Sequence, residues 1–346
     1  MSVDSNAHTV RIVAAGTSDL AVLAQGMSSG QMSSFTMGGL SSTLMDAGGG
    51  HSIMEYCQRG HWDPVHKLVQ FWGQGHNSET GLATWDDATN QWSVVNGVPY
   101  SNPATSTGHI GHQFTHQALD PATGDIYLRD YGGLTIYKKP YGSAWTTAAS
   151  LNSTSEFLQV ASALEWFPQA NSGAGGLVFV NVGNGSSEIG STQISNAAVS
   201  SWGSPVDAPT SMSAYCNWIA ASNSVLYFGG SNTNAYSMAA NGSMTTIAAT
   251  QLSAGAGVPW TGSGENRSPV VAGPDGASLF QFEYATNGNI YKFNGTSWSN
   301  VGSHSLVGGV GTAGWFLVSI PDYGVILCVQ QNSASVGTVT AKVYKA

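Results

Sequence analysis

The chain has 346 residues, of which 42% are hydrophobic and only 8% are charged, and its formal net charge is −9. Its 10 cationic residues form no cluster, so a nucleic-acid ligand is not expected, because phosphate backbones are bound by grouped Lys and Arg. The 10% of aromatic residues excludes a disordered chain. No run approaches 18 apolar residues, so we expect no membrane insertion. The odd number of widely spaced cysteines predicts buried thiols rather than a disulfide framework.

We expect residues 1–30 to form a lead-in or anchor segment, followed by a single domain over residues 31–346. Asp4, Arg11 and Asp19 interrupt the apolar residues of this segment. A signal peptide needs an unbroken apolar core behind a basic start, so no signal peptide is expected here.

Six later segments share one design: an apolar strand, a turn, a second apolar strand, glycines, a third strand, and an aromatic residue before a fourth strand. We align them on one turn position: Pro64, Pro121, Pro168, Ser222, Pro274 and Pro321. The spacings between these positions are 57, 47, 54, 52 and 47 residues. A period of about 50 residues built of four strands predicts the blades of a β-propeller.

Tryptophans precede or begin the last strand in four of these segments: Trp92, Trp145, Trp202 and Trp298. We expect these side chains to pack one blade against the next. Residues 31–37 carry the same outer-strand pattern without a blade of their own, and the last segment ends early. We therefore predict an all-β, six-bladed propeller of four-stranded blades, in which this N-terminal strand completes the C-terminal blade and closes the ring.

Glycine pairs follow the second strand in several segments, as at Gly132-Gly133 and Gly229-Gly230. With the later tryptophans, these pairs give residues 31–346 a resemblance to the kelch family, including the galactose-oxidase-like propellers. The stretches HWDPVHKLVQFWGQGHN and ATWDDATNQW also look like kelch-type propellers encoded by bacteriophages and bacteria.

Three histidines lie in GHIGHQFTH at residues 108–116, which the alignment assigns to the first strand of the second blade. Nine residues before each aligned turn position the chain carries a polar residue: Glu55, His112, Gln159, Ser213, Glu265 and Thr312. We predict that these six side chains form a ligand-binding ring at the channel mouth, with Arg59 and His116 one layer away. Propeller channels are wet, so water is favoured over a metal ion as an occupant of this ring.

No cofactor is expected. If the ring holds a metal, its carboxylates favour calcium over zinc. The remaining histidines are expected to be solvated in loops or at strand ends: His51, His61, His66, His76 and His304.

Low charge, abundant Gly, Ser, Thr and Asn, and no recognised export signal together suit a virion protein, which acts outside the cell after lysis. We predict a non-enzymatic propeller with a virion structural or surface-binding role, as an adhesin, decoration or tail-fibre protein. Its partners would be other virion subunits or a cell-surface glycan or protein. One alternative is a carbohydrate-active lyase or hydrolase that uses Glu55, Glu265 and His112 as acid and base. Another is an intracellular kelch-type module for protein interaction.

Overall fold

Most of the chain is described by the computed structural model. The described residues are 18–41, 44, 46–48, 51–52, 54, 59–74, 80–96, 116–129, 134–152, 162–181, 191–207, 216–222, 224–230, 235–242, 244–247, 269–283, 287–306, 315–331 and 339–346. No helix among them is long and apolar enough to cross a membrane.

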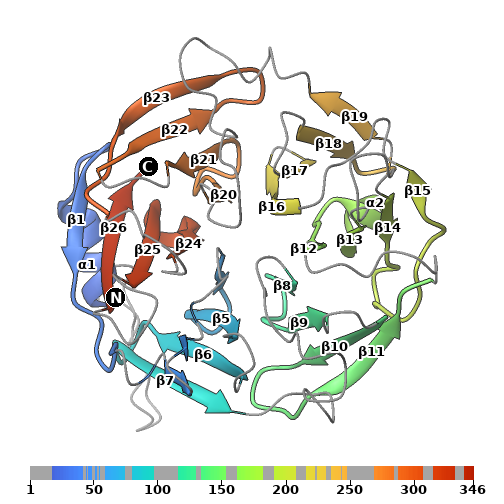
Figure 1. Ribbon diagram of the computed structural model, residues 1–346, viewed down its shortest axis with the longest axis horizontal. Coiled ribbons are helices and arrows are strands. Elements are labelled where there is room, and N and C mark those ends of the chain that lie inside the picture. The colour runs from blue at the N-terminus through green and yellow to red at the C-terminus, as the bar shows by residue number, and fades with distance from the viewer. Residues whose placement is uncertain are drawn as a thin grey trace, which may run out of the picture.

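Six four-stranded antiparallel sheets stand in a ring around a common centre, as Figure 1 shows. Blade 1 contains β4 (His61–Asp63), β5 (Leu68–Gln74), β6 (Thr80–Asp86) and β7 (Gln91–Asn96). Blade 2 contains β8 (Gln117–Leu119), β9 (Ile126–Arg129), β10 (Thr135–Lys139) and β11 (Thr146–Ser150). Blade 3 contains β12 (Ala163–Trp166), β13 (Leu177–Asn181), β14 (Ser191–Ile194) and β15 (Val206–Asp207), with the short helix α2 (Ala170–Gly173) between its first two strands.

Blade 4 contains β16 (Cys216–Ser222), β17 (Val225–Gly230), β18 (Ala235–Ala239) and β19 (Met244–Ile247). Blade 5 contains β20 (Val270–Ala272), β21 (Leu279–Phe282), β22 (Asn289–Phe293) and β23 (Trp298–Ser303). In each blade the first strand lies nearest the centre of the ring (Figure 1). The predicted six-bladed all-β propeller is therefore confirmed.

Blade 6 joins the two ends of the chain. Its inner strands are β24 (Trp315–Ile320), β25 (Val325–Gln331) and β26 (Val339–Lys345), with the 3-10 turn η1 (Pro321–Tyr323) after β24. Its outer strand is β1 (Met32–Phe35), which pairs with β26 in antiparallel register from Met32–Tyr344 to Phe35–Ala341. The predicted closure is confirmed, because β1 covers the edge of β26 and so ties the N-terminal part of the chain to its last blade. A small separate ribbon pairs β2 (Asp46–Gly48) with β3 (His51–Ser52).

A helix that the sequence did not predict precedes the closing strand. In α1 (Asp19–Gly26), the Ser18 hydroxyl accepts a hydrogen bond from the Ala21 amide at 3.1 Å and so caps the first turn. Leu20 and Ala24 are buried in the hydrophobic cluster shared by blades 1 and 6. Eight residues are too few to show a 3.6-residue apolar repeat, and packing against the propeller stabilises the helix instead.

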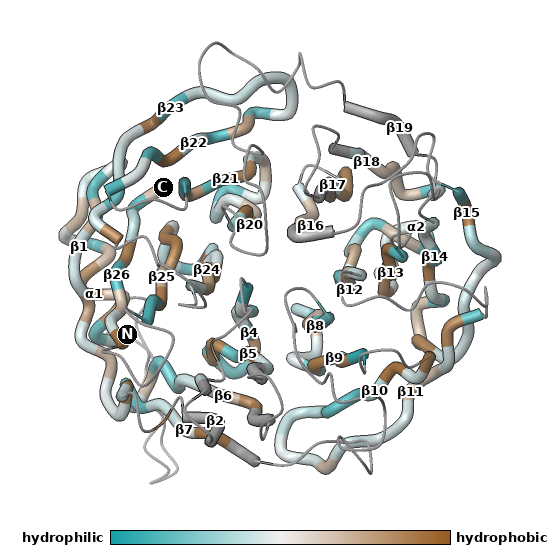
Figure 2. Tube along the Cα trace, in the orientation of Figure 1, coloured by the Kyte–Doolittle hydropathy of each residue, from teal (hydrophilic) through white to brown (hydrophobic). Residues whose placement is uncertain are grey.

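Aromatic side chains join neighbouring blades, as the tryptophan positions predicted. Trp92 of blade 1 makes an edge contact with Phe316 of blade 6, with ring centroids 6.2 Å apart. Trp145 of blade 2 packs edge-on to Trp72 of blade 1 at 5.3 Å. Hydrophobic segments coincide with the sheet strands, including β9, β17 and β25 (Figure 2).

A substitution at Phe35 tests how much the closing strand β1 contributes to the stability of the propeller. Its ring packs edge-on against Trp85 of blade 1 at 5.9 Å and is 9% exposed. We expect Phe35→Ala to lower the free energy of unfolding by about 3 kcal/mol, because it removes a buried ring that ties β1 to blade 1. Urea denaturation would measure the loss. Val22→Ala on the outer face of α1, where Val22 is 59% exposed, is the control and should change stability by less than about 0.5 kcal/mol. Equal effects of the two changes would contradict this role of Phe35.

Candidate functional site

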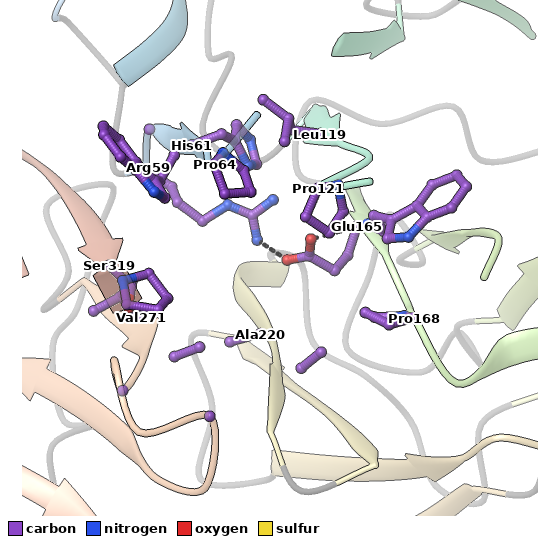
Figure 3. A pocket seen from close by; sticks show the side chains of 18 of the residues that line it. Arg59, His61, Pro64, Leu119, Pro121, Glu165, Pro168, Ala220, Val271 and Ser319 are labelled. Carbon is purple, nitrogen blue, oxygen red and sulfur yellow. Dashed lines mark hydrogen bonds and ion pairs between the residues drawn. The ribbon is translucent and has the colours of Figure 1, made fainter. Parts of the chain in front are cut away.

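A cavity of about 620 Å³ lies at the centre of the ring, where the first strands of all six blades end (Figure 3). Its wall is mainly apolar and includes four of the aligned turn prolines: Pro64, Pro121, Pro168 and Pro321. Besides two tryptophans, five side chains with polar groups line this wall: Arg59, His61, Glu165, Ser319 and Asp322. We refer to this space as the central cavity.

Arg59 is positioned by the junction of blades 6 and 1. It forms an isolated parallel bridge with Leu317 of β24, and the Gly60 amide donates to the Leu317 carbonyl at 3.1 Å. A Cβ atom on Gly60 would lie 2.8 Å from Val318, so glycine permits this close approach of the two blades. The Arg59 backbone is thus held at the edge of the channel and its side chain points across it.

The Arg59 guanidinium donates hydrogen bonds to three other blades. It forms an ion pair with the Glu165 carboxylate on β12, drawn as a dashed line in Figure 3. It also donates to the backbone carbonyls of Gln117 at 2.9 Å and Leu164 at 3.2 Å, and to that of Ile219 at 2.5 Å. One side chain from blade 1 therefore contacts blades 2, 3 and 4.

The Glu165 side chain is 13% exposed and is thus largely buried beside Arg59. Burial raises the pKa of Glu165, while the Arg59 charge and the Trp166 amide, which donates to Oε1 at 2.9 Å, act in the opposite direction. The opposite charges of Arg59 and Glu165 therefore neutralise each other at the inner end of the cavity. Removal of either side chain would leave the other charge largely buried without a partner, which would lower the stability of the fold.

His61 lies on β4 beside this pair and is only 9% exposed. Burial, and then the Arg59 charge, lower the pKa of His61 well below 6.5, so the imidazole is neutral at neutral pH. The Gln117 backbone acts in the opposite direction on this pKa, and the enclosed Nε2 has no hydrogen-bond partner among the described residues. The expectation of a solvated side chain is wrong for His61, because β4 is an inner strand covered by the neighbouring blades. It is also wrong for His304, which is 2% exposed and packs against Phe282 and Trp315.

Two further polar groups complete the wall. The Ser319 hydroxyl, from blade 6, is enclosed and has no hydrogen-bond partner in the described part of the chain. The Asp322 carboxylate accepts from Trp62 Nε1 at 2.5 Å and from Lys67 Nζ at 2.9 Å. The charge of Asp322 at the rim is therefore also balanced by a neighbouring cation.

Of the eight residues predicted to bind a ligand, two are described by the structure. Arg59 lines the central cavity, whereas His116 is 1% exposed, directly precedes β8 and does not line it. The other six lie outside the described residues, so the ring remains a prediction: Glu55, His112, Gln159, Ser213, Glu265 and Thr312. The described residues hold no group of three or more His, Cys, Asp or Glu that could bind a metal, and the calcium prediction rests on the undescribed carboxylates.

Sequence reasoning missed His61 and Glu165, although a signal for both was present. Three residues before each aligned turn position the chain carries His61, Ala118, Glu165, Ile219, Val271 and Val318. The two polar residues stand out at a position that is otherwise apolar in every inner strand. A polar residue at such a position must face the channel or find a buried partner.

The Arg59–Glu165 pair gives a prediction about stability. We expect Arg59→Met to reduce the free energy of unfolding by about 3–5 kcal/mol, since it leaves the Glu165 charge buried without compensation. Adding Glu165→Met should recover at least about 2 kcal/mol of that loss, as measured by urea denaturation. Lys67→Met is the control, because the Lys67–Asp322 pair is 41% and 30% exposed and should contribute at most about 1 kcal/mol. Strictly additive effects of the two core changes would show that the pair is not coupled.

His61 gives a prediction about pH. Its pKa in the folded chain lies below the unfolded value of 6.5, so the unfolded chain alone takes up a proton as the pH falls below 6.5. The stability of the wild type relative to His61→Gln should then fall by up to about 1.4 kcal/mol per pH unit below 6.5. Denaturation of both proteins at pH 7.5, 6.5 and 5.5 measures this difference, and other titrating groups cancel in it. A difference that does not change with pH would mean that His61 is protonated in the folded state.

No protein-family model and no curated protein matches the chain, so the resemblance to the kelch family stays a prediction. Solved structures do match it. A protein of unknown function from Bacteroides thetaiotaomicron VPI-5482 has 13% identity and a TM-score of 0.55, over 91% of this chain and 76% of that chain.

AofleA from Arthrobotrys oligospora has 12% identity and a TM-score of 0.52, over 90% of this chain and 91% of that chain. A luciferin-regenerating enzyme has 10% identity and a TM-score of 0.51, over 85% of this chain and 92% of that chain. At these identities the likeness shows a shared fold and no shared activity. The chain is a six-bladed β-propeller, and its fold is similar to that of solved structures with differing names.

Proposed function

We propose that this protein is a non-enzymatic binding propeller whose central cavity takes a sugar unit of a cell-surface glycan. The observation that carries this proposal is the cavity itself, whose volume of about 620 Å³ lies in the usual range for ligand sites. Its wall combines apolar surfaces with a few polar groups, which suits the carbon face and the hydroxyls of a sugar ring. A recessed space at the centre of the ring fits one protruding sugar better than a flat protein surface.

The state of the carboxylates supports binding without turnover. Glycoside hydrolysis needs one carboxyl group that delivers a proton and another that attacks or activates water. In the central cavity, Glu165 is paired with Arg59 and Asp322 is bonded to Trp62 and Lys67. Both acids are thus engaged in contacts within the protein. The alternative acid–base set of Glu55, Glu265 and His112 lies outside the described residues, and its activity is an outcome of the test below.

We place this binding function on a virus particle, where the protein would act in host attachment or decoration next to other virion subunits. Support comes from the composition, which is low in charge and has 44 glycines in 346 residues, and from the resemblance to bacteriophage-encoded propellers. A stiff ring of six blades is a suitable scaffold for exposing one binding face to a cell surface.

The first experiment combines binding with an assay for turnover. Purified protein is applied to an array of bacterial surface glycans, and the supernatant of each soluble glycan is assayed for newly formed reducing or unsaturated sugar ends. We expect binding without release. Released sugar would overturn the non-enzymatic assignment, and absence of binding across the array would overturn the glycan assignment.

Two proline variants of blade 2 locate the binding site. Pro121 is exposed at the cavity wall (Figure 3), so Pro121→Trp should obstruct the cavity and weaken binding at least about tenfold. Pro140, in the turn after β10, does not line the cavity, and Pro140→Trp should leave affinity within about twofold. Equal affinities of the two variants would place the bound glycan elsewhere on the propeller.

A further inference from the structure

A buried imidazole holds the segment of chain that leaves blade 5 toward blade 6. His304 directly follows β23 and is 2% exposed. The Leu306 amide donates a hydrogen bond to its Nδ1 at 3.2 Å, and its Nε2 donates to the Glu283 carbonyl oxygen at 2.7 Å. An amide N–H can only donate and a carbonyl oxygen can only accept, so the proton of the ring is on Nε2. The neutral ring is therefore the form that satisfies both hydrogen bonds.

Residues 304–306, which we call the strap, are bonded to blade 5 and to blade 6. The His304 amide donates to the Gly288 carbonyl at 2.8 Å, and the Asn287 amide donates to the Leu306 carbonyl at 3.0 Å. On the other side, Lys342 Nζ of β26 donates to the Ser305 carbonyl at 2.5 Å and to its hydroxyl at 2.7 Å. The strap thus joins the start of β22 to the blade that closes the ring.

The imidazole also packs between aromatic side chains of the two blades. It stacks on Phe282 of blade 5 with ring centroids 5.9 Å apart, and it meets Trp315 of blade 6 edge-on at 5.3 Å. Leu306 is fully buried in the same hydrophobic cluster. The position of the ring and the packing at this junction of blades therefore depend on each other.

Two charged side chains act on the ring from the elements around it. Burial, and then the charge of Lys342, lower the pKa of His304, whereas the carbonyl and the charge of Glu283 act in the opposite direction, and the net direction is downward. The Glu283 carboxylate is itself bonded to the Asn289 amide and side chain, both at 2.9 Å. Residues 284–286 and 307–314, next to these segments in the chain, contain no Asp, Glu, Lys, Arg or His.

Protonation of the ring is incompatible with the hydrogen bonds of the strap. A second proton on Nδ1 would point at the Leu306 N–H, so two donors would face each other and that bond would be lost. The new charge would also be enclosed between two aromatic rings and near the ammonium group of Lys342. The strap must move before the ring can carry a charge.

We propose that His304 is an acid-sensitive latch, which holds the strap between blades 5 and 6 when the ring is neutral and releases it when the ring is protonated. This device is independent of the proposed glycan site. Since the pKa of His304 is below 6.5 in the closed state, the open strap takes up the proton first as the pH falls. The closed state is therefore favoured above pH 6.5, and below it the opening equilibrium rises by up to about tenfold per pH unit.

Amide hydrogen exchange measures the opening in the wild-type protein. Mass spectrometry follows the peptide that contains residues 304–306 at pH 7.5, 6.5 and 5.5, with rates corrected for the intrinsic pH dependence of exchange. We expect protection of the strap to fall at least about threefold between pH 7.5 and 5.5. The internal reference is β17 in blade 4, whose residues 216–247 include no histidine, and its protection should change less than about twofold. Constant protection of the strap, or an equal loss in β17, would overturn the proposal.

His304→Asn tests the residue itself, because the asparagine Oδ1 can accept from the amide two residues later and does not titrate. We expect protection of the strap in this variant to change less than about twofold between pH 7.5 and 5.5, although the lost contact with Glu283 lowers it at every pH. His66→Asn is the matched control, since His66 lies in the turn after β4 and is bonded to Asp63. It should retain the loss seen in the wild type. A folded His304→Asn protein whose strap still opens in acid would contradict the assignment, and if this variant does not fold, the wild-type profile referred to β17 still decides.

Discussion

The guanidinium of Arg59 occupies the place where the inner strands of the propeller converge, and its hydrogen bonds connect blade 1 with blades 2, 3 and 4. Inner strands present carbonyl groups to a narrow channel, and those groups need donors when water is excluded. A planar group with five N–H donors can serve several carbonyls and a carboxylate at once, which a lysine could not do. The floor of the central cavity depends on this arrangement.

The Arg59–Glu165 pair also sets the character of the cavity above it. Because the two charges cancel, the space combines an apolar wall with a floor of no net charge. The same arginine contributes to keeping His61 neutral, since a second positive charge beside it would be repelled. A single buried cation therefore joins the blades, neutralises a carboxylate and helps to keep one imidazole ring uncharged.

Ring integrity has a second, independent source at the periphery. The strand β1 supplies the outer strand of blade 6, and Phe35 reaches Trp85 of blade 1. The helix α1 covers the same junction with Leu20 and Ala24. Hydrogen bonding closes the sheet, whereas apolar burial holds the first and last blades together. The Arg59 contacts thus join blades across the channel, whereas the peripheral contacts join the first blade to the last.

The architecture could be predicted from the sequence because each blade repeats a local pattern. Turn positions spaced about 50 residues apart, tryptophans such as Trp92 and Trp298, and an unpaired strand at residues 31–37 predicted six blades and their closure. These signals are local because alternating burial within a strand and the chemistry of a turn involve neighbouring residues.

The residues of the central cavity could be predicted from the sequence only in part. Arg59 was predicted to face the channel, but Glu165 lies 106 residues further along the chain, and no local pattern links the two. Only closure of the ring brings the ends of β4, β8, β12 and β16 close enough for one guanidinium to contact the last three of these strands. The burial that keeps His61 neutral likewise arises from neighbouring blades. The sequence by itself therefore determined the repeat, the strands and the closure, whereas the tertiary structure decided which polar side chains meet at the centre, because that meeting depends on contacts between blades.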